Sequence, residues 1–196
     1  MRPDGSAFAV LTVCSGNICR SPLAEQLLRG RLDRRFTIHS AGTIADDGPP
    51  MDETAAEMSR RYGGSPEGHR TQSLRAGLIA QSHLVLTATR AHRAAVVQLL
   101  PRASRFTVTL NQFARLIDAV SPADRAAWQQ PEDVIASAAA MRGVLVPLDD
   151  VSDDDIVDPY QRGLALHEKA AAIIDANVAV VVSAFRALPT HDGAGA

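Results

Sequence analysis

The sequence of 196 residues contains few cysteines, few aromatic residues and no large excess of one charge. It has two cysteines, and aromatic side chains make up 4% of the chain. The net charge of −2 provides no excess of positive charge that would attract nucleic acid. No aromatic residues alternate with the local arginine clusters. We therefore expect no binding of nucleic acid.

The sequence also lacks a long hydrophobic segment. Its first residues carry one arginine, then Asp4 and a short apolar run, which does not match a secretory signal peptide. The longest apolar segment, residues 170–185, is interrupted by Asp175, Asn177 and Ser183, so no membrane contact is expected. Without an export signal the cysteines should be reduced, and we expect a cytoplasmic location.

Short β-rich runs alternate with stretches of helical periodicity along the chain. Strands are expected at residues 7–13, 36–40, 83–88 and 105–110, and helices after Pro22 and at residues 52–62, 73–80, 91–100 and 162–188. Such alternation is typical of βαβ units and of a parallel sheet covered on both faces. The sequence predicts one α/β domain over residues 1–188, with three α/β/α layers, a four-stranded parallel sheet and a flexible tail at 189–196.

Residues 118–150 are the hardest segment to place. Helices are expected near 122–129 and 131–142, whereas residues 144–148 fit an edge strand or a loop. So short a segment cannot bury a hydrophobic core alone. We therefore interpret residues 118–150 as an insertion at the edge of the single domain, of unknown purpose.

Both cysteines lie in one loop, residues 14–21, which reads CSGNICRS. A structural zinc site needs about four ligands, and His39 and His69 could join the loop only through the fold, so no metal and no cofactor are expected. Two inert, buried cysteines are the simpler alternative. The loop, however, leaves the end of the first strand and enters a helix, which is where ligands bind in open α/β sheets.

The residues between the cysteines suit a bound anion. Ser21 is expected to cap the next helix, with Pro22 at its first position. Gly16 permits a tight turn, and Asn17 tolerates left-handed backbone geometry. The free N–H groups of the loop and of the first helical turn then form a positive concavity, which favours the thiolate form of Cys14.

Arg20 completes this chemistry. A loop wound around a tetrahedral anion can bring its guanidinium beside the group that the Cys14 thiolate attacks. The planar fork of arginine suits two oxygens of a phosphoryl group. A cysteine, an N–H cradle and an arginine together describe a thiolate that attacks phosphorus and forms a phosphocysteine intermediate.

The nine-residue pattern Cys-x-Gly-Asn-x-Cys-Arg-Ser-Pro, directly after an N-terminal strand, resembles the low-molecular-weight protein tyrosine phosphatases. The likeness continues at residues 40–43, 69–70, 83–88 and 158–160, and covers roughly residues 7–110 and 151–187. The resemblance implies metal-independent hydrolysis of aryl phosphate, with phosphotyrosine in proteins as substrate. It implies that Cys14 is the nucleophile and Arg20 the phosphate clamp.

The resemblance also implies roles for the rest of the loop and its surroundings. Substrate phosphate is expected to contact Ser15, Gly16, Asn17, Ile18, Cys19 and Ser21. The Ser21 hydroxyl would hydrogen-bond the thiolate and help it leave in the second step. Asn17, Ser40 and His69 would hold the loop in shape. Without the family, His69 reads as an ordinary loop histidine and Ser40 as a strand-end hydroxyl.

Expulsion of a phenolate needs a proton donor, and hydrolysis then needs a base. Acidic residues gather at 149–158, and most of them fit a solvated loop. Asp158 differs because Pro159 stiffens the backbone and Tyr160 follows. The match to the Asp-Pro-aromatic signature of the family implies that Asp158 is the acid and base. Tyr160 is expected to line the pocket against a substrate ring, or else to be exposed with no role.

Three segments depart from the family pattern and leave the substrate open. Residues 43–51 carry two aspartates and no aromatic residue, residues 87–89 have threonines where many relatives have a Met-Asp pair, and residues 118–150 are longer. An arsenate reductase that borrows an external thiol is one alternative, because no cysteine follows Cys19. A non-catalytic phosphate-binding module is another. We expect a monomer or a weak dimer.

Cys19 admits two interpretations. As a resolving thiol it would form a disulfide with Cys14 after peroxide converts Cys14 to a sulfenic acid, making the enzyme redox-regulated. Alternatively it only packs under the loop.

Overall fold

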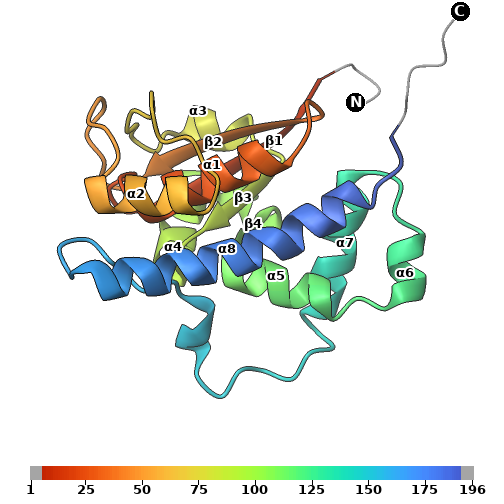
Figure 1. Cartoon of the computed structure of the whole chain (residues 1–196). Coiled ribbons are helices and arrows are strands. Elements are labelled where there is room, and N and C mark those ends of the chain that lie inside the picture. Colours follow the sequence, from red (N-terminus) through yellow and green to blue (C-terminus); the bar gives the residue numbers. More distant parts are fainter. Residues whose placement is uncertain (1–5, 191–196) are drawn as a thin grey trace, which may run out of the picture.

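The computed structural model describes residues 6–190, in which four parallel strands form one sheet in the order β2-β1-β3-β4 (Figure 1). The strands are β1 (Phe8–Cys14), β2 (Phe36–Gly42), β3 (Leu84–Thr87) and β4 (Thr107–Thr109). The α-helices are α1 (Arg20–Arg31), α2 (Glu53–Arg61), α3 (Ala76–Ala80), α4 (Arg90–Leu99), α5 (Leu110–Asp118), α6 (Pro122–Ala126), α7 (Pro131–Met141) and α8 (Leu164–Arg186). The predicted α/β class with a four-stranded parallel sheet is confirmed.

The alternating side chains of β1 divide the hydrophobic core between the two faces of the sheet. Phe8 and Val10 enter a large cluster with α1, α2, α5 and α8, whereas Leu11 and Val13 enter a smaller cluster with α3 and α4. Successive strand residues point to opposite faces, so one apolar strand supplies both clusters. The result is the predicted three-layer arrangement, with α8 lying across α1, α2 and α5 (Figure 1).

Helix α8 forms because its apolar residues recur every three or four positions and face the sheet layer. Ala170, Ile174, Val178, Val181 and Phe185 are all buried along this stripe. Among the described residues, no helix is long and apolar enough to cross a membrane.

The segment around residues 118–150 contributes to the main core. Trp128, Val134 and Ala138 are buried in the larger cluster, against α5 and α8. Residues 144–148 form no strand, and this part of the chain loops outward below α5 (Figure 1). The domain and insertion boundaries stay predictions, and residues 191–196 of the predicted tail lie outside the described residues.

Two local predictions are wrong. Residue 110 was expected to end a strand, but β4 is only three residues long and α5 begins at Leu110, where Thr109 caps the helix by accepting a hydrogen bond from Gln112 N. Ser21 was expected to cap α1, but the helix already begins at Arg20 and Cys19 is its N-cap residue. The Ser21 hydroxyl is engaged inside the active-site loop instead.

Candidate active site

The loop that joins β1 to α1 lies at the carboxyl end of the sheet, where β1 is flanked by β2 and β3. Asn17 has φ 55, so it adopts the left-handed backbone geometry expected from the sequence. The neighbouring strand holds the loop in place, because the N–H groups of Thr43 and Ile44 donate to the carbonyl oxygens of Cys14 and Ser15.

Cys14 and Ser21 face each other across the loop, with Cys14 Sγ 3.0 Å from Ser21 Oγ. Asn17 Nδ2 donates to Ser21 Oγ at 3.0 Å and to Ser40 Oγ at 2.7 Å. A His69 ring nitrogen, Nε2, is 2.9 Å from the Asn17 carbonyl oxygen. All five side chains are buried, so this polar network holds the loop in one shape.

Glu25, which was not predicted from the sequence, anchors this network from α1. Its carboxylate accepts a hydrogen bond from Ser40 and lies 3.6 Å from His69 Nδ1, and it also pairs with Arg29. Burial alone would raise the pKa of Glu25, but the nearby His69 ring, the hydrogen bond from Ser40 and the charge of Arg29 hold that pKa below its ordinary value. Glu25 therefore remains charged beneath the loop.

Arg20 connects the loop to the segment before α8. Its Nη2 atom lies 2.8 Å from Asp158 Oδ2, and Nη1 donates to the Ile156 carbonyl oxygen at 3.1 Å. The arginine side chain is only 5% exposed, whereas that of Asp158 is 51% exposed. Among the described residues, Arg20 Nε is buried without a hydrogen-bond partner. A buried donor of this kind is suited to an anionic ligand.

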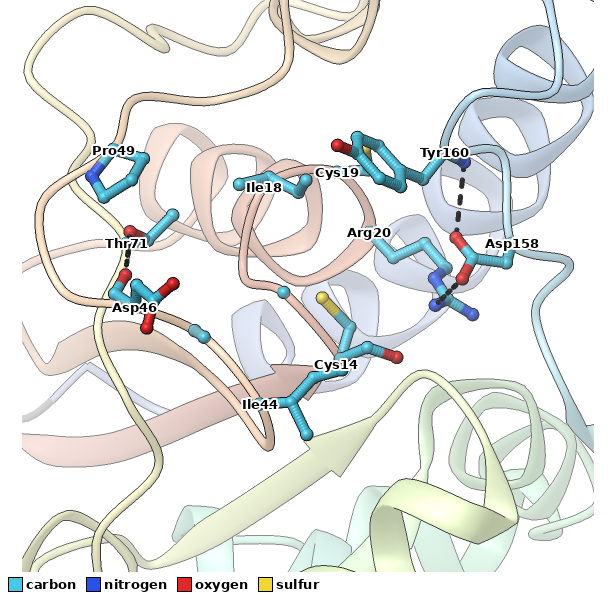
Figure 2. Close-up of a pocket in the computed structure, with 13 residues that line it drawn as sticks. Cys14, Ile18, Cys19, Arg20, Ile44, Asp46, Pro49, Thr71, Asp158 and Tyr160 are labelled. Atoms are coloured by element: carbon cyan, nitrogen blue, oxygen red, sulfur yellow. Dashed lines mark hydrogen bonds and ion pairs between the residues drawn. The ribbon is translucent and has the colours of Figure 1, made fainter.

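A pocket of about 550 Å³ opens above the Cys14 thiol (Figure 2). Its lining comprises Cys14, Ser15, Gly16, Ile18, Cys19, Arg20, Ile44, Ala45, Asp46, Pro49, Thr71, Asp158 and Tyr160. Tyr160 and Ile18 provide apolar walls near the thiol, and Asp46 lies on the opposite side (Figure 2). Tyr160 is 46% exposed, which leaves it available to a substrate.

Cys19 differs from Cys14 in its surroundings. It is 4% exposed and belongs to the main hydrophobic cluster. Burial, reinforced by the nearby Asp52 carboxylate and Cys14, raises the pKa of the Cys19 thiol far above its ordinary value. Both cysteines are free thiols in this structure. The packing agrees with the second interpretation of Cys19, and its resolving role stays a prediction.

His92 is a second residue of the site that has no sequence signal. Its ring bridges two hydroxyl groups, with Nε2 2.8 Å from Ser15 Oγ and Nδ1 2.8 Å from Thr89 Oγ1. Burial, together with the charge of Arg20, lowers the pKa of His92 to about 4. The neutral ring thus ties the loop of residues 14–21 to the start of α4.

The structure brings every site residue predicted from the sequence to this pocket or to the network beneath it. A thiol at the mouth of an N–H cradle, a buried arginine and a facing carboxylate define the class of cysteine-dependent phosphatases. A family model described as low molecular weight phosphotyrosine protein phosphatase matches residues 9–132. The chain therefore belongs to the low molecular weight phosphotyrosine protein phosphatase family, whose members are cysteine-dependent, metal-independent hydrolases.

Individual relatives agree with this assignment. The chain is 37% identical over 105 residues to the low molecular weight protein-tyrosine-phosphatase Etp of Escherichia coli, covering 54% of this chain and 70% of Etp. It is 33% identical over 133 residues to the probable phosphatase AmsI of Erwinia amylovora, covering 67% and 92%. The predicted family and enzyme class are confirmed, and neither alternative, the arsenate reductase or the binding module, is favoured.

Solved structures share the fold. The crystal structure of AmsI matches with a TM-score of 0.68 at 24% identity, covering 94% of this chain and 97% of AmsI. An arginine phosphatase, YwlE of Geobacillus stearothermophilus, matches with a TM-score of 0.67 at 24% identity, covering 90% and 91%. Residue 158 lies beyond the residues that the family model matches, so the role of Asp158 depends on geometry.

Proposed function

We propose that this protein hydrolyses phosphotyrosine in proteins through a phosphocysteine intermediate formed on Cys14. The observation that carries the proposal is the convergence of three groups on one pocket: the Cys14 thiol, the buried Arg20 guanidinium and the half-exposed Asp158 carboxyl. Their side chains come from β1, α1 and the segment before α8, and they face the same space (Figure 2).

In the first step the Cys14 thiolate attacks phosphorus, and the bond from phosphorus to the aryl oxygen breaks. Loop N–H groups and Arg20 hold the phosphoryl oxygens as negative charge shifts toward them. Arg20 pairs with Asp158 in the present structure, and a phosphate in the loop takes up guanidinium N–H groups, including the unpartnered Nε. Asp158 gives its proton to the leaving oxygen.

In the second step a water molecule attacks phosphorus and passes a proton to the Asp158 carboxylate. The bond from phosphorus to sulfur breaks, and inorganic phosphate and the Cys14 thiolate are released. The Ser21 hydroxyl, 3.0 Å from Cys14 Sγ, supports the departing thiolate by hydrogen bonding. No step needs a metal or a cofactor.

The pocket walls favour an aromatic substrate. Ile18 and the ring of Tyr160 flank the approach to the thiol, and a phenyl ring between them buries apolar surface on both faces. A short phosphoserine side chain makes neither contact. A phosphoarginine side chain is the relevant competitor, because an arginine phosphatase shares this fold.

Three phosphopeptides of matched sequence test the substrate class, carrying phosphotyrosine, phosphoserine or phosphoarginine, assayed with EDTA present. We expect kcat/KM for phosphotyrosine to exceed the other two by at least about 30-fold, since two apolar contacts of about 1–3 kcal/mol each separate them. A preference for phosphoarginine or phosphoserine contradicts the proposal. Thiol-dependent arsenate reduction, measured alongside, is expected to be absent.

The Cys14→Ser variant is the matched control for the mechanism. Its hydroxyl keeps the shape of the site, but it is a far weaker nucleophile than a thiolate. Turnover of the phosphotyrosine peptide should fall to background, while phosphate still binds to the loop and to Arg20. Activity that survives this substitution, or that requires added metal, contradicts the phosphocysteine route.

We further propose, from the sequence, a cytoplasmic location.

A further inference from the structure

Cys19, Asp52 and His167 meet beneath the phosphate-binding loop, although they come from three separate parts of the chain. One sulfur, nitrogen or oxygen atom of each lies within 4.8 Å of the other two. Cys19 precedes α1, Asp52 caps α2, and His167 lies in the first turn of α8. Among the described residues this is the one such cluster of three metal-ligating side chains.

The imidazole of His167 lies close to the Asp52 carboxylate without a hydrogen bond to it. Its side chain is 5% exposed, and within the described part of the chain its ring makes no hydrogen bond. Its Nε2 atom approaches Asp52 Oδ1 only to 3.8 Å, which is beyond hydrogen-bond distance. The ring nitrogen and the carboxylate oxygen therefore face each other across a gap that a bound cation would bridge.

A small void lies at the same place. Cys19 and His167 both border it, together with Arg20, Pro159 and apolar residues of α1, α2 and α8. Its volume of about 10 Å³ fits a single ion or one water molecule and nothing larger. Asp52 does not line this void, and its side chain is 25% exposed, so an ion bound to it can keep a water ligand.

We propose that Cys19, Asp52 and His167 form a regulatory site for a zinc-like divalent cation. Thiolate, imidazole and carboxylate are the donor set that zinc takes in proteins, at about 2.0–2.3 Å. Tetrahedral bonds of that length place donor atoms about 3.5 Å apart. The three donors, already within 4.8 Å of one another, reach that spacing by closing about 1 Å.

Binding of the cation replaces a thiol proton and involves no oxidation or reduction. The Cys19 thiol releases its proton to solvent, and its sulfur, a ring nitrogen of His167 and a carboxylate oxygen of Asp52 then bind the cation. Asp52 can still cap α2 while it binds the cation, because only Oδ1 accepts the hydrogen bond from Ala55 N and Oδ2 is left for the cation.

The site is joined to the catalytic loop by direct contacts. Cys19 is the residue before Arg20, and the Ile18 carbonyl oxygen accepts a hydrogen bond from Asp52 N at 3.0 Å. Drawing Cys19 Sγ toward His167 therefore moves the loop that holds phosphate. A 1 Å displacement in such a site costs about 100-fold in rate, so we expect the cation to inhibit. This regulatory half of the inference rests on the proposed phosphatase function.

Cobalt(II) tests the site without relying on activity. In the full-length Cys14→Ser protein Cys19 is the one remaining thiol, so a thiolate-to-cobalt charge-transfer band reports this site alone. We expect the band to saturate at one equivalent of cobalt and to disappear when zinc is added. Adding Cys19→Ala or His167→Phe to this background should abolish or strongly weaken the band, whereas His39→Phe, at an exposed strand position, should leave it intact.

The absence of a band in the Cys14→Ser protein, or a band that survives both Cys19→Ala and His167→Phe, overturns the site. Asp52→Asn serves as a further check, because asparagine keeps the cap of α2 but removes the charge. This variant should also bind cobalt more weakly. If it binds as the parent does, Asp52 is not a ligand and the three-residue site is wrong.

Inhibition is tested separately with buffered free zinc in the enzyme that retains Cys14. His167 lies outside the catalytic machinery, and phenylalanine fills its buried place. We expect His167→Phe to raise the zinc concentration for half-inhibition at least about tenfold without changing kcat/KM in EDTA. An unchanged half-inhibiting concentration, with cobalt binding intact, overturns the regulatory coupling and leaves the phosphatase proposal unaffected.

Discussion

At the scale of single residues, the proposed general-acid role of Asp158 predicts how the enzyme responds to a poor leaving group. Its carboxyl faces the pocket and pairs with Arg20, 2.8 Å away. For Asp158→Asn we expect kcat to fall about 100- to 1,000-fold with phosphotyrosine, because no proton reaches the phenolate. With an activated aryl phosphate, whose phenolate leaves without a proton, the loss should be much smaller. Initial rates across a series of leaving groups measure this.

Equal losses across that series would contradict the general-acid role. Tyr160→Ala is the matched control from the same segment. It removes an apolar wall and no proton donor, so it should raise KM for phosphotyrosine while leaving the leaving-group dependence as in the parent.

His92 makes the stability of the protein depend on pH. Burial lowers its pKa from 6.5 to about 4 in the folded protein. Between these values the unfolded chain binds more protons than the folded chain, so the free energy of unfolding falls as pH drops from 6.5 toward 4. The stability that the neutral His92 ring contributes is fully present above pH 6.5. Urea unfolding of His92→Gln should show a shallower decline over this range, by up to one proton.

A decline in His92→Gln as steep as that of the parent would contradict this prediction. His39→Gln, at an exposed position of β2, provides the control and should keep the parental slope. Loss of the link from His92 to Ser15 should also raise KM, because the loop is then less firmly held.

At the scale of the elements, the end of β2 packs closely against the loop of residues 14–21. A Cβ atom at Gly42 would lie 2.9 Å from Asn17 N, and closer still to the Ser15 carbonyl oxygen and Ala45 Cβ. Backbone atoms cannot yield as a flexible side chain does. For Gly42→Ala we therefore expect kcat/KM to fall about 10- to 100-fold, measured by steady-state kinetics on the purified folded protein.

Gly77 in α3 is the control for Gly42. A Cβ atom there meets nothing within 4 Å, and alanine is the better helix former. Gly77→Ala should leave kcat/KM unchanged and stabilise the protein slightly. A Gly42→Ala enzyme with parental kinetics would show that the loop does not depend on its packing against β2.

At the scale of the whole molecule, α8 joins the core to both halves of the chain. Phe185, fully buried near its end, has its ring centroid 4.9 Å from that of Phe36 and 5.9 Å from that of Phe8. Phe185→Ala should lower the free energy of unfolding by about 3–5 kcal/mol, through lost burial and the cavity left behind. Denaturant titration measures this.

Phe185 does not line the catalytic pocket, so kcat of the folded Phe185→Ala protein at low temperature should equal that of the parent. Val146→Ala is the control, because Val146 is 83% exposed and its loss should change stability by less than about 0.5 kcal/mol. A loss below about 1 kcal/mol for Phe185→Ala would contradict the stated role of this ring cluster.

The sequence alone was sufficient to place Cys14 and Arg20 in one strand-to-helix loop and to predict the class of fold. Cys14 and Arg20 lie in one short segment, so strand, loop and helix assemble through local backbone geometry and bring them together. The repeating β and helical patterns likewise follow from which side chains must be buried. Helix α5 was not predicted from the sequence. A strand of three residues is too short for its alternating pattern to show where the strand ends and the helix begins.

Tertiary structure alone decided the groups that reach the loop from distant parts of the chain. The Asp-Pro-aromatic signature of the family suggested a role for Asp158, but no spacing in the sequence indicated its contact with Arg20. Glu25 and His92 gave no signal, because a buried ionisable residue looks like a surface one until its partners are known. Packing of α8 against α1 and α2 likewise created the cluster of Cys19, Asp52 and His167.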